Sequence, residues 1–583
     1  MKGVIATLFI LVSTSIQAQD NPVFSNPVME QILSGDYDPV DYDDPNALMS
    51  PTSIYEDVEA QMSADSLERY LTDLTSFFNR NTGADTLSAT EGVGAARNFI
   101  LEELQNISTR RKGRLVTGFY QFDREICEIT RHKNVIGILP GIGADREEFI
   151  LLEAHYDSRC EDRCGIDCQA DGADDNGSGT ALVMELARVL SKYKFNRSII
   201  FMLTTGEEQG LVGARSFAEY CFNNGINIRA VYNNDVVGGI ICGETASPPG
   251  CPGLNEIDSV NLRVYSANGN GSIHKGLARF VKMQYEDEMA QYVNTPTQVR
   301  LMSAEDRTGR GGDHIPFREL GYPAIRFTEA NEHGNGNPST PDYADRQHSV
   351  RDVIGEDTNG DGVIDEYYVD FNYLRRNALV NAAAIVSTAA GPATPASVDL
   401  TEIPGGFVVR VNDPDVFDEY RIGVRRLTSG PEFDTVFTID AKLDTIIGIP
   451  RFFYYISVAS VDSIGIESIF TQEERLSVPS FTKELPEEIE ENAWELQQNT
   501  PNPFDEATWI RIIKHREVPY KEAFLVITDM KGQPLTKIRV DLREKVTEVL
   551  YDYAHHNYEP GVYAYSLVID GVRVDTKRMI YAY

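Results

Sequence analysis

Short apolar runs alternate with helical patterns through the first two thirds of the chain. Three runs cover residues 149–154, 198–203 and 230–232, and residues 180–193 repeat apolar positions at the spacing of one helix face. Runs of this kind are typical of parallel strands that are buried on both faces by covering helices. The pattern therefore predicts an α/β fold, with a mixed, largely parallel sheet between two layers of helices.

The limits of this α/β region are also visible in the pattern. A helical repeat begins within residues 64–79, and the last one covers residues 371–389. Residues 391–395 are then rich in Gly, Pro, Ala and Thr, which is typical of a domain boundary. We expect one large domain over residues 61–391.

Alternating strand patterns replace the helical ones after residue 391, as at residues 406–411 and 453–461. They predict a small all-β sandwich over residues 392–480, and this segment resembles a fibronectin type III domain. An acidic linker over residues 481–494 separates it from a second small β-sandwich at residues 495–583.

The last segment has two sequence signatures. It opens on Asn-Thr-Pro-Asn-Pro-Phe at residues 499–504 and carries Gly-Val-Tyr at residues 561–563. It resembles the C-terminal sorting domain of the type IX secretion system, although an ordinary β-sandwich is the alternative. The resemblance implies export through the inner and outer membranes, with the secretion machinery as a partner and the protein either released or held at the cell surface.

The N-terminus resembles a secretory signal peptide over residues 1–18. Lys2 precedes an apolar stretch at residues 4–12, which is too short to span a bilayer, and Ala18 suits cleavage. A retained helix is the alternative. Residues 19–60 are acidic and rich in proline without an apolar period, so we expect a propeptide or a linker there. No later segment is a candidate transmembrane helix.

Charge and cysteine content narrow the function further. The chain has 53 Lys and Arg against 89 Asp and Glu, a net charge of −36, which disfavours nucleic acid and anionic membranes as partners. Seven cysteines suit an oxidising compartment, and an odd number leaves at least one free or paired to another chain. We expect disulfides within the trio at 160, 164 and 168, rather than a zinc cluster, and between Cys242 and Cys251.

Metal-type ligands follow each of the three apolar runs. His155 and Asp157 follow the first, Glu207 and Glu208 the second, and Asp235 the third. Because ligands of open α/β sheets bind beyond the carboxyl ends of the strands, these side chains are predicted to meet at one edge. Imidazole and carboxylate groups are the ligands that zinc takes.

A glycine-rich segment at residues 172–179 precedes the helical pattern of residues 180–193. Its glycines allow a sharp turn, and a carboxylate just before a helix can bridge two cations, so Asp174 and Asp175 are candidates for such a site. A turn with an N-cap and a calcium loop are the alternatives for this segment. Two adjacent glutamates beside a cation are most favourable when one is a metal ligand and the other is a general base or acid with a shifted pKa, and Glu207 and Glu208 are such a pair. We expect His155 to be a ligand and Asp157 to accept a hydrogen bond from a ligand imidazole.

The order of these motifs over residues 60–390 resembles the M28 family of zinc aminopeptidases. The resemblance implies a phosphorylase/hydrolase-like fold, two zinc ions per chain, peptide or protein substrates and a cis peptide bond between Asp175 and Asn176. It also implies a role for each residue: His155 and Asp235 on one zinc, Glu208 and His348 on the other, Asp175 as the bridge, Glu207 as general base and Asp157 as orienting group.

The last histidine ligand has several candidates. His348, with Asp352 four residues later, fits the place that the family gives it, and His314 and His333 are the rivals. We expect Asp313, His314 and Phe317 to line the substrate pocket. Some members of the family place a tyrosine near here to stabilise the oxyanion. Arg310 is a candidate substitute, and stabilisation by the zinc alone is the alternative.

Residues 357–365 form a separate acidic motif with the spacing of the first part of a calcium loop. Position twelve of that loop is Tyr368 instead of Glu, so a plain acidic turn is the alternative. The candidate calcium ligands are Asp357, Asn359, Asp361 and Asp365.

Two other functions fit the same chain. One is a single-zinc enzyme like glutaminyl cyclase, and the other is a non-catalytic surface adhesin that binds through its β-sandwiches. The number of zinc ions per chain separates them, because the aminopeptidase requires two, the cyclase one and the adhesin none.

Overall fold

The structure of the chain is a computed structural model. It describes residues 21–243, 250–251, 253–267, 269, 271–306, 310–331, 346–478, 493–517, 519–529, 534–552, 560–570 and 572–582. The expected signal peptide, most of the acidic linker at 481–494 and the rival ligand His333 lie outside these residues.

A nine-stranded sheet organises the first two thirds of the chain, in the order β1-β2-β3-β5-β4-β6-β9-β7-β8. The central strands β5, β4, β6 and β9 are mutually parallel, which confirms the expected mixed, largely parallel sheet. Each predicted run lies in one of them. The strands are β1 Val23–Phe24, β2 Val116–Ile126, β3 Ile129–Leu139, β4 Glu148–His155, β5 Ser198–Thr204, β6 Asn227–Asn234, β7 Asn261–Ser266, β8 Gln298–Leu301 and β9 Ala324–Glu329.

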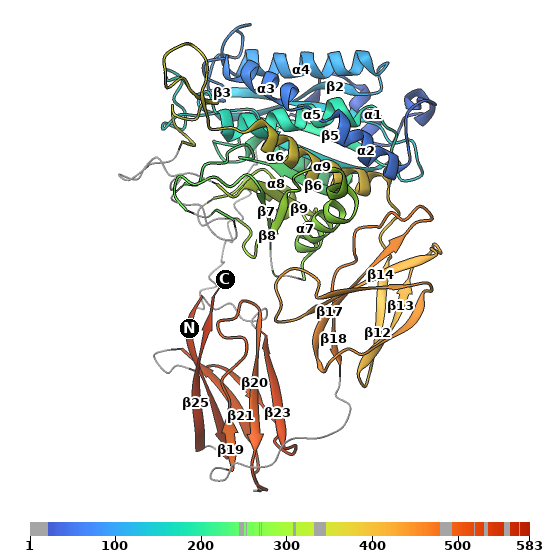
Figure 1. The fold of residues 1–583 in the computed structure, drawn as a ribbon, viewed down its shortest axis with the longest axis vertical. Coiled ribbons are helices and arrows are strands. Elements are labelled where there is room, and N and C mark those ends of the chain that lie inside the picture. The colour runs from blue at the N-terminus through green and yellow to red at the C-terminus, as the bar shows by residue number, and fades with distance from the viewer. Residues whose placement is uncertain are drawn as a thin grey trace, which may run out of the picture.

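Helices cover both faces of this sheet (Figure 1). Along β4, Ile150 and Leu152 enter one hydrophobic core, whereas Phe149 and Leu151 enter a second core on the other face. The first core contains side chains of α2 Pro51–Gln61, α3 Ala64–Thr75, α4 Gly92–Arg110, α5 Gly179–Leu190, α7 Ile273–Gln284 and α9 Phe371–Ala390. The second contains those of α1 Val28–Leu33, α6 Val212–Asn223 and α8 His314–Glu319. Three layers result, as expected.

Residues 21–60 pack against this domain, which corrects the expectation of a linker there, whereas a propeptide stays a prediction. β1 pairs with the edge strand β2, and Met29 and Ile32 of α1 are completely buried. On the opposite face, the Tyr55 hydroxyl of α2 lies 2.7 Å from the Ser387 hydroxyl of α9. The buried side chains have the spacing of one helix face, Met29, Ile32 and Leu33 in α1 and Ile54, Tyr55 and Val58 in α2, but each helix is too short to sustain that period along the sequence.

Two pairs of small antiparallel sheets follow the α/β fold. The first pair has a shared core and comprises β12 Ser397–Ile403, β13 Gly406–Asn412 and β16 Leu443–Ile447 against β14 Glu419–Arg426, β15 Thr435–Ile439, β17 Phe452–Val461 and β18 Glu474–Val478. The second pair comprises β19 Trp494–Leu496, β20 Ala507–Lys514 and β23 Val546–Asp552 against β21 Ala523–Thr528, β22 Pro534–Arg539, β24 Gly561–Ile569 and β25 Val572–Tyr581.

A buried ion pair network joins the α/β fold to the sheets that follow it. The Glu473 carboxylate lies 2.9 Å from Arg279 of α7 and 2.8 Å from Arg425 of β14. All three side chains are almost completely buried, so loss of one partner would leave an uncompensated charge in the interface.

Three disulfides connect six of the seven cysteines. Cys160 pairs with Cys168 inside the loop after β4, and Cys164 of the same loop pairs with Cys127. The pairing of Cys242 with Cys251 is confirmed, and the remaining thiol, Cys221, is free and buried. None of the described helices is both long and apolar enough to cross a membrane.

Candidate metal centre

The parallel register brings the predicted ligands to one edge of the sheet. β4 ends at His155, which lies opposite Thr204, the last residue of β5. Glu207 and Glu208 therefore leave β5 beside the end of β4, and Asp235 directly follows β6 on the other side. The two neighbours of β4 supply carboxylates around the histidine that β4 supplies.

Two groups of side chains at this edge have the arrangement of metal ligands. The first is His155, Glu207 and Asp235, and the second is Asp175, Glu208 and His348. Within each group, the donor atoms lie within 4.8 Å of one another. The structure thus brings together every residue predicted to bind zinc, together with the predicted base.

Asp175 belongs to the second group and also faces the histidine of the first. One of its carboxylate oxygens is 3.2 Å from the Nε2 atom of His155, and the other is 3.1 Å from the Nε2 atom of His348. The remaining ligand atoms are close: Asp235 Oδ1 is 3.4 Å from His155 Nε2, and Glu208 Oε2 is 3.3 Å from His348 Nε2. A carboxylate that directs its two oxygens at two histidines has the geometry of a bridge.

Burial makes this collection of charges costly without cations. Burial raises the pKa of Glu207 and of Glu208 well above the ordinary value. Burial also opposes ionisation of Asp175, but the adjacent imidazoles of His155 and His348 hold its pKa well below the ordinary value. His155 Nε2 and Glu208 Oε1 are buried without a hydrogen-bond partner among the described residues. Such unsatisfied nitrogen and oxygen donors fit zinc.

Asp157 supports the site differently from the prediction. The nearest acceptor for His155 Nδ1 is the backbone oxygen of Asp157 at 3.0 Å, whereas its carboxylate is 3.6 Å away. That carboxylate instead accepts bonds from the backbone N–H groups of Glu207 and Glu208, each at 3.4 Å, and from Thr82 at 3.2 Å. Asp157 therefore also positions the turn that carries both glutamates.

Asp352 and Arg80 hold the turn that precedes α5, a role that was not predicted from the sequence. The Asp352 carboxylate accepts bonds from the backbone N–H groups of Asp174 and Asp175, both at 2.9 Å. The completely buried Arg80 donates to the carbonyls of Tyr156 and Gly172, at 2.8 and 3.0 Å. The expected cis peptide bond between Asp175 and Asn176 is present. The only sequence signal for Asp352 was its place four residues after His348.

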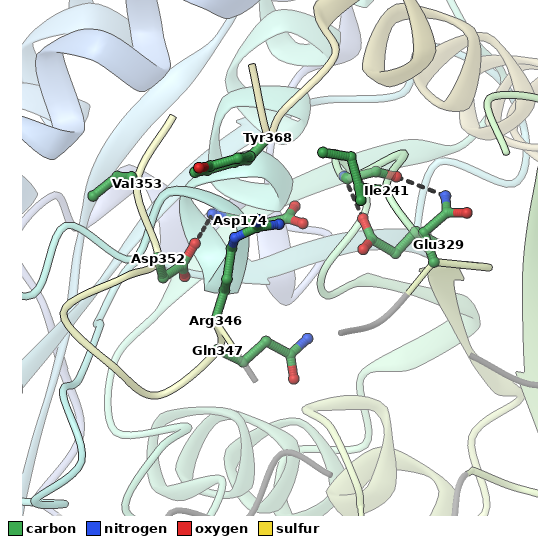
Figure 2. A pocket seen from close by; sticks show the side chains of 10 residues that line it. Asp174, Ile241, Glu329, Arg346, Gln347, Asp352, Val353 and Tyr368 are labelled. Atoms are coloured by element: carbon green, nitrogen blue, oxygen red, sulfur yellow. Dashed lines mark hydrogen bonds between the residues drawn. The ribbon is translucent and has the colours of Figure 1, made fainter. Parts of the chain in front are cut away.

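Asp174 lies on the other side of this turn, beside a small second cavity (Figure 2). Its carboxylate accepts a bond from the backbone N–H of Gly238 at 2.9 Å, and burial raises its pKa to about 6. Glu329 and Asp352 line the same cavity, and the Arg346 guanidinium stacks over the Tyr368 ring. Asp174 therefore belongs to the packing behind the metal centre.

The ligand groups open into a cleft of about 260 Å³. The predicted pocket residue Arg310 lines it. Asp313, His314 and Phe317 do not, and all three are completely buried, which corrects that prediction. α8 directs Phe317 into the core with α6, and the Asp313 carboxylate accepts a bond from the Thr204 hydroxyl. The cleft is lined by Arg159, Arg163, Asp175, Glu207, Glu208, Gly210, Leu211, Asp235, Val236, Arg310, Gly311, Arg326, Gln347 and His348.

The buried Asp313 predicts a pH dependence of stability. Burial raises its pKa from 3.8 to about 7, so the folded protein holds this proton more tightly than the unfolded chain does. The stability that the protonated form contributes is fully present below pH 3.8 and is lost as the pH rises to about 7. We expect Asp313→Asn, which stays neutral, to weaken this decline in the metal-free protein. Urea unfolding across the range measures it, and an unchanged slope would contradict the assignment.

Comparison with known proteins agrees with this site. The model of peptidase family M28 matches residues 134–362. A probable zinc metalloprotease of Pyrenophora tritici-repentis is 31% identical over 60% of this chain and 80% of its own length. Another from Leptosphaeria maculans is 33% identical over 58% and 77%.

Solved structures give weaker matches. The LapA aminopeptidase of Legionella pneumophila is 18% identical, with a TM-score of 0.42 over 60% of this chain and 78% of that one. The glutaminyl cyclase of Porphyromonas gingivalis is 19% identical, with a TM-score of 0.39 over 56% and 98%. The level of identity to the metalloproteases, over most of their length, establishes the relationship: the chain belongs to peptidase family M28 and is a zinc metallopeptidase.

Proposed function

We propose that the chain is a di-zinc aminopeptidase, which removes the N-terminal residue from peptides. The observation that carries the proposal is the position of Asp175, with one oxygen facing each histidine. In this proposal, His155 and Asp235 would hold one zinc, Glu208 and His348 would hold the other, and Asp175 would be shared by both.

Glu207 is the proposed general base. A zinc pair, when bound, lowers the pKa of a water molecule and polarises the scissile carbonyl. The Glu207 carboxylate lines the cleft, where it can take the proton from the attacking water and pass it to the leaving amine. Burial raises its pKa, which favours a group that must both accept and release a proton near neutral pH.

The preference for a free N-terminus can be tested with pairs of substrates that differ only in whether the α-amine is free or acetylated. With zinc present, we expect hydrolysis of amino-acid anilides that carry a free amine, and loss of that activity after N-acetylation or chelation. Release of the anilide chromophore measures the rate, and restoration by added zinc is the control. Hydrolysis of the acetylated anilides at the same rate would contradict an aminopeptidase while leaving a zinc peptidase intact.

A calcium site in the hairpin formed by β10 Gly355–Glu356 and β11 Glu366–Tyr367 is a second part of the proposal. Asp357 accepts backbone bonds from Gly360 and Gly362, both at 2.6 Å, and these bonds lower its pKa. The Asp357 carboxylate is therefore ionised except at acidic pH, and its side chain is exposed to solvent. We expect calorimetry to show calcium binding at millimolar levels or below, and Asp357→Asn with Asp361→Asn to remove it. Absence of binding heat in the unaltered protein would contradict the site.

We also propose that the protein is exported and acts outside the cell or at its surface. The support is the signal-like N-terminus, three disulfides and the C-terminal segment that resembles a type IX sorting domain. The segment over residues 392–480 is proposed as a fibronectin type III-like domain, on the basis of its paired antiparallel sheets.

A further inference from the structure

The cleft that contains the ligand groups is also lined by arginines. Arg159, Arg163 and Arg310 share it with the four carboxylates of the ligand groups and the base. A fourth, Arg326, already forms ion pairs with Asp306 at 2.6 Å and with Asp235 at 3.1 Å. The cleft therefore combines two kinds of charge, and only one of them is explained by metal binding.

The balance of these charges changes when the proposed zinc pair is bound. The cleft-lining carboxylates are Asp175, Glu207, Glu208 and Asp235, and two divalent cations would offset their four negative charges. No other carboxylate is among the described residues that line the cleft. Among these described residues, Arg159 and Arg163 then contribute positive charge that the four carboxylates no longer balance, in a chain whose net charge is −36. A cationic cleft on a strongly anionic protein attracts anionic substrates selectively.

Arg163 is held in place at the rim of the cleft. It lies beside Cys164, in a loop fixed by the disulfides Cys127–Cys164 and Cys160–Cys168. Its backbone carbonyl accepts bonds from the side chains of Asn81 and Gln209, both at 2.9 Å. Its own side chain is exposed and forms no ion pair with a described residue. Because the backbone of Arg163 is already fixed, its exposed guanidinium would lose less conformational freedom on binding a substrate.

The other two arginines are placed deeper. Arg159 is 8% exposed, with its Nη1 atom 3.8 Å from Glu208 Oε2. Its remaining nitrogens donate to the carbonyls of Cys160 and Glu161, which fixes the guanidinium. Arg310 donates to the side chain of Gln347 at 2.5 Å, directly beside His348. The positive charge thus extends from the rim to the ligand groups.

Apolar lining is sparse by comparison. Among the described residues that line the cleft, the aliphatic ones are Leu211 and Val236. Pockets that select apolar groups are lined mainly by hydrophobic side chains. We therefore infer that this cleft selects substrates with a carboxylate near the scissile bond, which its arginines bind. This inference rests on the proposed aminopeptidase function and names the substrate class.

The carboxylate has two possible sources, and the test has one arm for each. The first arm compares the anilides of glutamate and glutamine, which differ only in the charge of the N-terminal side chain. The second compares the dipeptide Leu-Ala with its C-terminal amide. We expect kcat/KM to favour the charged member of one pair by about 10- to 100-fold, in the manner of charge-assisted recognition.

Variants assign the preference to the arginines. Arg163→Gln and Arg310→Gln are each expected to lower the preference about tenfold or more, mainly through KM. Arg110→Gln is the matched control, because Arg110 is exposed at the end of α4 and does not line the cleft. A wild-type preference that both cleft variants retain would overturn the inference, as would equal rates within both pairs.

Binding without turnover separates this inference from the proposed function. Calorimetry on the zinc-loaded Glu207→Gln protein compares Glu-Ala amide with Gln-Ala amide, and Leu-Ala with its amide. Tighter binding of the charged member, with no hydrolysis by the wild-type protein, would leave the inference intact and contradict the aminopeptidase. Hydrolysis of all four compounds with no preference in rate or affinity would support the aminopeptidase and contradict the inference about its substrates.

Discussion

Replacing Glu207 by Gln is expected to lower kcat by about 10²- to 10⁴-fold, the range that general acid–base groups contribute. The amide has nearly the shape of the carboxylate but cannot accept the proton of the attacking water. Because the proposed ligands are untouched, the variant should still bind two zinc ions. Anilide hydrolysis and metal analysis on the same preparation measure both quantities.

A matched glutamate variant makes this result interpretable. Glu102 is exposed on α4 and does not line the cleft, so Glu102→Gln should retain the wild-type rate. A Glu207→Gln protein that holds two zinc ions and works at nearly the wild-type rate would rule out Glu207 as the base. Loss of zinc in that variant would instead make Glu207 a ligand of the first group, which its distance to His155 and Asp235 permits.

Replacing Asp175 by Ala is expected to remove activity and to weaken zinc binding by more than about 100-fold. Loss of a group that only orients a ligand already costs about 10- to 100-fold in metal affinity, and Asp175 faces both ligand groups directly. Zinc should also raise the melting temperature of the wild-type protein, because it binds only the folded state, and this increase should shrink in the variant.

The neighbouring carboxylate provides the control for Asp175. Asp174→Asn keeps an oxygen that can accept the bond from the Gly238 backbone, and it lies beside the second cavity behind the metal centre. It should retain both zinc ions and most of the activity. Equal losses in the two variants would mean that the effect comes from disturbing the turn, and would contradict a bridging role for Asp175.

Much of the site could be predicted from the sequence because it follows from strand order. A parallel strand that ends in a ligand places that ligand at a known edge, so His155, Glu208 and Asp235 could be grouped without coordinates. The Cys242–Cys251 pair was visible for a similar reason, since it closes a short loop. His348 depended on the family resemblance, because more than a hundred residues separate it from the other ligands.

The remaining features depend on tertiary packing that local patterns do not carry. Asp352 and Arg80 bind backbone atoms of a distant turn, and nothing beside them in the sequence marks those partners. Phe317 was misplaced because nearness to candidate ligands in the sequence does not reveal which way a short helix faces. Residues 21–60 were predicted to be a propeptide or a linker because α1 and α2 are short, so their buried side chains do not sustain a helical period.

The number of zinc ions bound per chain tests the central claim most directly. Elemental analysis of the purified full-length protein, after dialysis against trace zinc, gives the stoichiometry. We predict two zinc ions, shared between the group of His155 and Asp235 and the group of Glu208 and His348, with Asp175 common to both. A value of one would contradict the di-zinc centre and favour a single-zinc enzyme like glutaminyl cyclase, and a value of zero would contradict the metal site altogether.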